Sequence, residues 1–241
     1  MSAGKVVKPG TGELSAGRGE RSSPDWGGIV AALKAWRKKR GEEDPSVTTV
    51  AERYRKDPWA VLVSTILSLR TKDEVTLKTS HALLAKAPNP ASALALTEQQ
   101  AAALAYPAGF YKTKAANIRK IASIIIEKYG GRVPSDMDAL LELPGVGRKT
   151  ANLVLIEAYD KYGICVDIHV HRISNRTGWL SSKTPEETEM ILRNILPKKF
   201  WKAINPLLVL YGQNVCRPLS PFCSRCVIKK HCAGTGVEKT R

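Results

Sequence analysis

A lysine beside a glycine-rich turn is the first candidate for chemistry in this sequence. The run LPGVGRKTANLVL, residues 143–155, places Gly145 and Gly147 just before a basic pair and an apolar helical pattern. A helix that begins after Gly147 would direct unpaired N–H groups and the positive end of its dipole at an anion such as a DNA phosphate. The two glycines supply backbone freedom where a Cβ atom would obstruct a close approach. The alternative is a plain helical hairpin in which glycine only ends the first helix.

Lys149 stands in the first turn of that expected helix. The helix dipole and partial burial both disfavour an ammonium there, so the neutral amine becomes easier to form. A neutral lysine amine is a nucleophile. An ordinary phosphate-binding lysine is the other interpretation, and this feature alone does not decide between them.

Asp167 precedes a second apolar helical pattern, in GICVDIHVHRISNRTGW, and can cap that helix. If its carboxylate also faces Lys149, it could stabilise positive charge that develops on a sugar ring. A purely structural cap is compatible with that role. His169 and His171 are two positions apart and therefore point to different faces of a helix, which disfavours a metal motif with Asp167. We expect both histidines to be structural or to face DNA.

Four of the five cysteines crowd into the run CRPLSPFCSRCVIKKHC, with six, two and five residues between successive members. Such a set is typical of one metal centre, either a tetrahedral zinc ion or a 4Fe-4S cluster. Zinc ribbons usually separate two C-x2-C pairs by a longer stretch, so this compact spacing favours the cluster. We expect the centre to stabilise the fold of the C-terminal segment rather than to transfer electrons. The expected ligands are Cys216, Cys223, Cys226 and Cys232, whereas Cys165 is expected to be a small core residue.

The composition indicates a folded protein with a polyanionic partner. The chain has 241 residues, of which 43% are hydrophobic, and 38 basic against 22 acidic residues give a formal charge of +16. Nucleic acid is the leading candidate for the partner, and a charge that only aids solubility is the alternative. No apolar run is long enough to span a membrane, and the first residues, which lack an apolar segment, are not expected to be a signal peptide. We expect a cytoplasmic protein, associated with the nucleoid, that has no membrane contact.

Helical periodicity predicts an all-α fold. No stretch alternates like a strand, and the most uniformly apolar segment, 58–69, is expected to be a buried central helix. The hairpin is expected to join helices over 137–143 and 148–159. Further helices are predicted over 25–41, 73–87, 113–130, 185–197 and 200–212.

The runs LPGVGRKTAN and VDIHVHR and the cysteine spacing C-x6-C-x2-C-x5-C together resemble the endonuclease III family of DNA glycosylases, within the helix-hairpin-helix glycosylase superfamily. The resemblance spans roughly residues 28 to 232 and implies two all-α lobes with a DNA cleft between them. One lobe, residues 58–163, would be a six-helix barrel that contains the hairpin. The other, residues 25–57 with 164–241, would carry the 4Fe-4S cluster, and residues 1–24 would form a flexible basic extension.

The same resemblance implies the chemistry. Lys149 matches the nucleophilic lysine of the family and Asp167 its carboxylate. The family fills the gap left by a flipped base from two loops, which here are LSLRTKD and AGFYKTKA and nominate Arg70 and Phe110. Lys114, in the second loop, and the hairpin glycines are also expected to contact DNA.

The implied function is a bifunctional glycosylase and abasic-site lyase that removes oxidised pyrimidines from damaged double-stranded DNA as a monomer. Adenine glycosylases and thymine mismatch enzymes of the superfamily are less favoured, because they tend to lack a lysine at this position. From another class, a noncatalytic DNA-binding module with the same hairpin and metal centre is the main alternative. The resemblance leaves the lesion spectrum and the preferred opposing base open.

Overall fold

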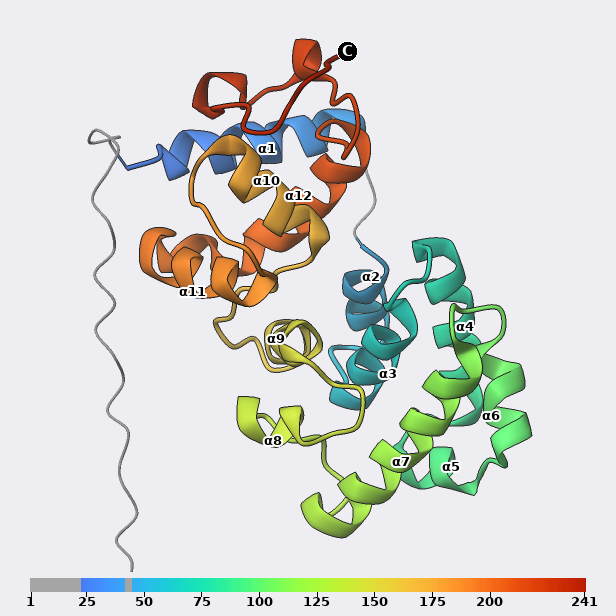
Figure 1. The fold of residues 1–241 in the computed structure, drawn as a ribbon. Coiled ribbons are helices and arrows are strands. Elements are labelled where there is room, and N and C mark those ends of the chain that lie inside the picture. The colour runs from blue at the N-terminus through green and yellow to red at the C-terminus, as the bar shows by residue number, and fades with distance from the viewer. Residues whose placement is uncertain (1–22, 42–44) are drawn as a thin grey trace, which may run out of the picture.

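The computed structural model of the protein describes residues 23–41 and 45–241. The regular elements within these ranges are all helical, which confirms the predicted fold class. Figure 1 shows two groups of helices, with α9 lying where the groups approach each other. The expected N-terminal extension, residues 1–24, falls almost entirely outside the described residues.

The lower group in Figure 1 packs around one continuous hydrophobic core and corresponds to the lobe expected to form a barrel. Its helices follow one another along the chain, so most of its contacts form between segments that are close in sequence. We call this group the barrel lobe. It consists of α2 (Ser46–Arg53), α3 (Pro58–Ser68), α4 (Asp73–Lys86), α5 (Pro90–Ala95), α6 (Glu98–Ala105), α7 (Tyr111–Tyr129), α8 (Met137–Leu141) and α9 (Arg148–Glu157).

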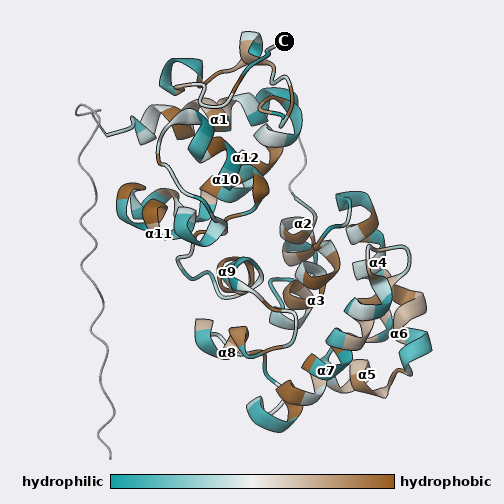
Figure 2. Ribbon diagram, viewed as in Figure 1, coloured by the Kyte–Doolittle hydropathy of each residue, from teal (hydrophilic) through white to brown (hydrophobic). Residues whose placement is uncertain are grey.

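Helix α3 is the central helix of the barrel lobe, as its apolar run predicts. Asp57 caps it by accepting a hydrogen bond from the Ala60 amide at 2.8 Å, and Pro58 occupies the first turn. Nine of its eleven residues are buried, and it packs against α2, α4, α7 and α9. Figure 2 shows hydrophobic colour along much of this helix. Because α3 is held on nearly every side, the loop that follows it starts from a fixed point.

The upper group packs around a second core, built from segments far apart in the sequence. Trp26 lies edge-on against Trp179, and Trp36 lies edge-on against Tyr211, each pair with ring centroids 5.0 Å apart. Aromatic contacts therefore join the first helix to the C-terminal part of the chain. We call this group the cysteine lobe. It consists of α1 (Trp26–Arg40), α10 (Ile168–Thr177), α11 (Pro185–Ile195), α12 (Trp201–Asn214) and the 3-10 turns η1 (Lys198–Phe200), η2 (Cys223–Arg225) and η3 (Lys229–His231).

The boundary between the lobes differs from the expected one at α2. Residues 25–57 were expected in the cysteine lobe, yet Val47, Val50 and Ala51 belong to the core of the barrel lobe, because α2 packs on α3 and α4. We therefore propose that the boundary falls between α1 and α2. Ile164 and Val166 belong to the second core, which supports the proposed return to the cysteine lobe at residue 164.

None of the helices in the described ranges is long and apolar enough to cross a membrane.

Candidate active site

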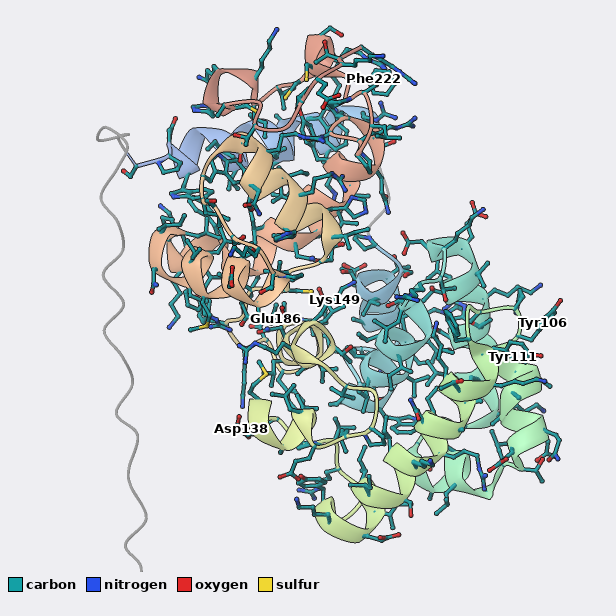
Figure 3. The ribbon with its side chains drawn as sticks, in the orientation of Figure 1. Tyr106, Tyr111, Asp138, Lys149, Glu186 and Phe222 are labelled. Carbon is teal, nitrogen blue, oxygen red and sulfur yellow. The ribbon has the colours of Figure 1, made fainter. Side chains whose placement is uncertain are left out.

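A cavity of about 670 Å³ lies between the two lobes. One wall comes from α2, the end of α3 and the start of α9, and the other comes from α10, α11 and α12. Lys149 and Asp167 both line this cavity, so the fold brings together the two residues that were expected to act together. In Figure 3, Lys149 lies near the centre of the molecule, at the side of α9 that faces the cysteine lobe.

The glycine turn of the hairpin has one glycine that the fold requires and one that it does not. Gly145 has a φ of +78°, and a Cβ atom there would lie 2.7 Å from Nδ2 of Asn117. Gly147 has a φ of −99°, and no protein atom lies within 4 Å of its would-be Cβ. Within the protein, a Cβ atom would therefore meet a neighbouring side chain at Gly145 but not at Gly147. At Gly147 the open space lies outside the protein, at the start of α9.

Lys149 is the second residue of α9 and is half-buried in the cavity wall. Gly147 is the N-cap of this helix and offers no side-chain acceptor to the first amides. Among the described residues, the Lys149 ammonium has no hydrogen bond or ion-pair partner. The side chain is therefore available to a ligand in the cavity, and a neutral amine there stays a prediction.

Arg148, the other member of the basic pair, contacts a buried carboxylate of the protein and so is not free to bind a phosphate. Its guanidinium donates to both oxygens of Glu189, at 3.1 Å and 2.9 Å, and Arg193 donates to the same carboxylate at 2.8 Å. Burial on its own would raise the pKa of Glu189, but the hydrogen bonds from Arg148 and Arg193 hold that pKa below its usual value. This carboxylate joins α9 of the barrel lobe to α11 of the cysteine lobe. No pattern in the sequence pointed to Glu189.

Asp167 is the N-cap of α10, as predicted. Its Oδ1 accepts hydrogen bonds from the amides of His169 and Val170, each at 2.9 Å. The residue is nearly buried, with 9% of its surface exposed, and it lines the cavity. Since one oxygen accepts both cap hydrogen bonds, the other can face a ligand without uncapping the helix.

The two histidines of α10 differ in their surroundings. His171 is structural, since its Nδ1 lies 2.7 Å from the Thr188 hydroxyl. His169 lines the cavity, and burial lowers its pKa. Nη2 of Arg172 lies 3.0 Å from Nδ1 of His169. Because a guanidinium can only donate, Nδ1 must accept, and the neutral ring carries its proton on Nε2.

Arg70 and Phe110, the two residues expected to enter the DNA, also line the cavity. Both side chains are exposed, and the guanidinium carbon of Arg70 lies 5.8 Å from the centre of the Phe110 ring. Lys114 lines the cavity as well, but its contacts within the protein disfavour the expected DNA contact. Only 6% of Lys114 is exposed, and its ammonium donates to three protein acceptors.

Ser46 and Asp73 form a further polar pair on the cavity wall that the sequence analysis missed. The Ser46 hydroxyl donates to Oδ1 of Asp73 at 2.7 Å, and both residues line the cavity. The two residues are 27 positions apart, so no local pattern could have linked them. They add neutral and acidic hydrogen-bonding groups opposite Asp167 and His169.

The four clustered cysteines lie near one another in the cysteine lobe. Burial raises the pKa of Cys223 and of Cys232, and the neighbouring cysteines raise both further. Nη1 of Arg176 lies 3.4 Å from the sulfur of Cys216, and the Tyr211 hydroxyl lies 3.2 Å from that of Cys226. Such donors suit thiolates that bind a metal centre.

The four sulfurs are the candidate ligands of the predicted metal centre. In the described part of the chain, no three His, Cys, Asp or Glu side chains are placed to hold a single metal ion. Four thiols, with hydrogen-bond donors beside two of them, are a donor set that fits a metal centre. Cys165 lies apart and is fully buried, as expected of a core residue.

Comparison with known proteins gives the same family by sequence and by structure. Residues 63–198 match the model of the HhH-GPD superfamily of base excision DNA repair proteins. Endonuclease III of Thermotoga maritima is 47% identical over 176 residues, which cover 73% of this chain and 83% of that protein. The chloroplastic endonuclease III homolog 1 of Arabidopsis thaliana is 45% identical over 223 residues, which cover 84% of this chain but only 58% of the plant protein.

A solved structure of a trapped covalent intermediate between endonuclease III and DNA aligns with a TM-score of 0.72 and 30% identity. The alignment covers 87% of this chain and 96% of the chain in that structure. The alignment therefore spans both lobes. The sequence match over more than half of the chain and the shared two-lobed architecture place this chain in the endonuclease III family of base excision repair proteins.

Proposed function

We propose that the cavity between the lobes carries out both steps of a bifunctional DNA glycosylase and abasic-site lyase on oxidised pyrimidines in duplex DNA. The observation that carries this proposal is that Lys149 and Asp167, from different lobes, line one cavity. A nucleophile and a carboxylate that line one cavity can act on the same extruded sugar. The solved covalent endonuclease III–DNA intermediate supports the covalent step.

In the first step the neutral amine of Lys149 attacks C1′ of the damaged nucleotide. A bond from Nζ to C1′ forms as the bond from C1′ to the base breaks, and the electron pair leaves with the base. Opening of the sugar ring then gives a Schiff base between Lys149 and C1′. Loss of a C2′ proton expels the 3′ phosphate by β-elimination, which cuts the strand, and hydrolysis returns the free amine.

Asp167 acts by electrostatics in this scheme. As the base leaves, positive charge develops on the sugar ring, and a carboxylate held in a fixed position stabilises it. The two cap hydrogen bonds to Oδ1 hold Asp167 in place, so the group does not need to reorganise during the reaction. Nε2–H of His169 offers a donor on the same wall.

The start of α9 is the proposed binding site for a DNA phosphate. No side chain caps this ten-residue helix, and the space beside Gly147 is open. A phosphate there would meet the unpaired amides and the positive end of the helix dipole without any contact to a base. Such binding does not depend on the DNA sequence, as a repair enzyme that scans duplex DNA requires.

Cys216, Cys223, Cys226 and Cys232 would hold a 4Fe-4S cluster. When bound, the cluster would crosslink four points of the C-terminal chain, and such clusters can also exchange an electron. Arg176 and Tyr211 would donate to two of the ligating sulfurs. Purified protein that is brown and contains four irons per chain would support the cluster, whereas colourless protein with one zinc would favour the alternative.

We further propose that the protein acts as a monomer on DNA at the nucleoid of the cytoplasm. Each hydrophobic core is built from residues of a single chain, which supports a monomer. Light scattering of the purified protein with and without DNA tests the stoichiometry.

Borohydride trapping tests the enzymatic proposal. Reduction of the Schiff base on a duplex that carries thymine glycol should leave a stable protein–DNA adduct with the parent protein. The adduct should be absent with Lys149→Gln, which retains a polar side chain of similar length. Lys120→Gln, at an exposed position of α7, is the matched control and should trap normally. Tight binding with neither trapping nor cleavage would instead identify a noncatalytic DNA-binding module.

A further inference from the structure

Two loops with unusual backbone conformations meet at the mouth of the cavity. Arg70 follows α3 with a φ of +52°, and Phe110 precedes α7 with a φ of +56°. Residues other than glycine rarely adopt a positive φ, and residues with bulky side chains do so only where surrounding contacts hold the backbone. Both residues are exposed and both line the cavity. Something beneath these loops must therefore fix them.

Lys114 lies beneath the Arg70 loop and fixes its backbone. This lysine belongs to α7, and its ammonium donates to the carbonyl of Leu67 at 2.8 Å, to the carbonyl of Leu69 at 2.5 Å and to the hydroxyl of Thr71 at 2.8 Å. The three protons of the ammonium thus have three acceptors. These acceptors span the end of α3 and the turn that contains Arg70.

Thr71 extends the same contact to the Phe110 loop. Its hydroxyl oxygen accepts a hydrogen bond from the Gly109 amide at 3.1 Å, while its proton is directed at the Leu69 carbonyl, 3.3 Å away. The backbones approach so closely that a Cβ atom on Gly109 would lie 2.5 Å from the Arg70 carbonyl oxygen. We call Lys114, Thr71 and Gly109 the loop junction.

We propose that Lys114 is a positioning residue, which through the loop junction holds Arg70 and Phe110 as one preformed unit that enters the DNA stack together. This inference rests on the proposed function of the cavity. It reassigns the lysine from a DNA contact to a support for the two residues that make the contact. Coupling of the loops would restrict which opposing base fits beside the inserted pair, because neither side chain can adjust alone.

The charge state of Lys114 agrees with this geometry. Burial lowers its pKa to about 8, so the amine is still mostly protonated at neutral pH and can make all three hydrogen bonds. The acceptors are two carbonyls and a hydroxyl, all uncharged. Hydrogen bonds to the loops, and not an ion pair, therefore compensate for the burial of this charge.

Hydrogen exchange tests the junction without any chemistry. Lys114→Met removes the three donors and keeps the apolar stem, and Lys120→Met removes one charge from an exposed position of the same helix. Exchange of the Gly109 amide should become at least tenfold faster in Lys114→Met and should stay within twofold in Lys120→Met. Unchanged exchange in Lys114→Met would overturn the proposal.

A second pair of variants covers the case in which Lys114→Met does not fold. Thr71→Val has nearly the same shape as threonine but lacks the hydroxyl, and Thr71→Ser keeps it. The Gly109 amide should exchange faster in Thr71→Val and at the parent rate in Thr71→Ser. Equal exchange in the two variants would show that the hydroxyl does not join the loops.

Activity on two substrates distinguishes positioning from a general loss of structure. Excision of thymine glycol from duplex DNA requires insertion into the stack, whereas trapping on an abasic site in single-stranded DNA does not. Lys114→Met should lose at least tenfold in single-turnover excision and less than twofold in trapping on the single strand. Parallel losses on both substrates would overturn the positioning role. A parent protein that traps on neither substrate would refute the proposed function, while the exchange experiment would still decide the junction.

Discussion

Asp167 combines a structural and a proposed catalytic role at one carboxylate. Oδ1 accepts the two hydrogen bonds that begin α10, and the residue lines the same cavity as Lys149. Asparagine can make the same cap contacts with its amide oxygen but carries no charge. Substitutions at this one position can therefore separate the two roles.

Asp167→Asn should slow base excision by about 100-fold or more while the protein stays folded, because loss of one preorganised electrostatic group has costs of this size. Asp167→Ala should show the same loss of activity and also lower the free energy of unfolding by about 1 kcal/mol, since the cap is lost. Single-turnover excision and urea unfolding measure the two effects. Parent-like excision in Asp167→Asn would refute the catalytic role.

The buried amine of Lys114 predicts a pH dependence of stability. Its pKa is about 8 in the folded protein and 10.5 in the unfolded chain, so between these values the unfolded chain binds more protons. The free energy of unfolding should therefore rise with pH in this window, by at most about 1.4 kcal/mol per pH unit from this group. Urea unfolding at pH 7, 8 and 9 should show the rise relative to Lys114→Met. Parallel curves for the two proteins would contradict a lowered pKa.

Helices α9 and α11 meet at a single buried carboxylate. Glu189 on α11 receives hydrogen bonds from Arg148 at the start of α9 and from Arg193 one turn further along α11. Arg193 also donates to Asn152 of α9 at 3.2 Å. Because Lys149 directly follows Arg148, this contact helps to set the position of the proposed nucleophile relative to the cysteine lobe.

Glu189→Gln should lower the free energy of unfolding by about 2 kcal/mol, because two guanidinium groups lose their shared anion in a largely buried site. It should also reduce trapping on abasic DNA, since the start of α9 is less firmly held. Glu52→Gln makes the same chemical change at an exposed position of α2 and should alter neither property. Urea unfolding and borohydride trapping provide the measurements.

The long helices could be predicted from the sequence and three short ones could not. Predicted helices over 58–69, 113–130 and 185–197 match α3, α7 and α11 to within about two residues, because their apolar residues repeat at helical spacing. The missed helices are short and lack a run of large apolar residues. Two of them carried start signals, since Asn89 with Ser92 and Thr97 with Gln100 form capping boxes at the starts of α5 and α6. The missed elements are α2, α5 and α6.

The active-site partners come together only in the whole molecule. Asp167 and Lys149 could be nominated because each stands at a helix start with a recognisable pattern. Glu189 could not be connected to Arg148, because the two are 41 positions apart and the pairing depends on how the lobes pack. Lys114 appeared to be one more basic residue of a DNA-binding loop, since sequence shows charge but not burial. Local patterns thus predicted the helices and the chemistry, and lobe packing determined the contacts.

The overall charge of the protein predicts strongly salt-dependent DNA binding. With a formal charge of +16, the protein should displace counterions from several phosphates on binding. Four phosphate contacts would give a slope of about −3.6 in a plot of log affinity against log salt concentration. Fluorescence anisotropy with a duplex that contains a stable abasic analogue measures this slope. A slope near zero would mean that the positive charge does not form the contact surface.

Because Cys165 is buried, alkylation of the folded protein can report how many of the other four cysteines are free. Cys165 is fully buried and burial raises its pKa to about 12, so it should not react with an alkylating reagent while the protein is folded. Iodoacetamide should then add no carbamidomethyl groups to a folded chain whose other four thiols all ligate iron, and five after complete denaturation. Chains that have lost the cluster but stay folded should gain four. Intact-mass spectra would therefore report the loaded fraction of a preparation as the ratio of two peaks.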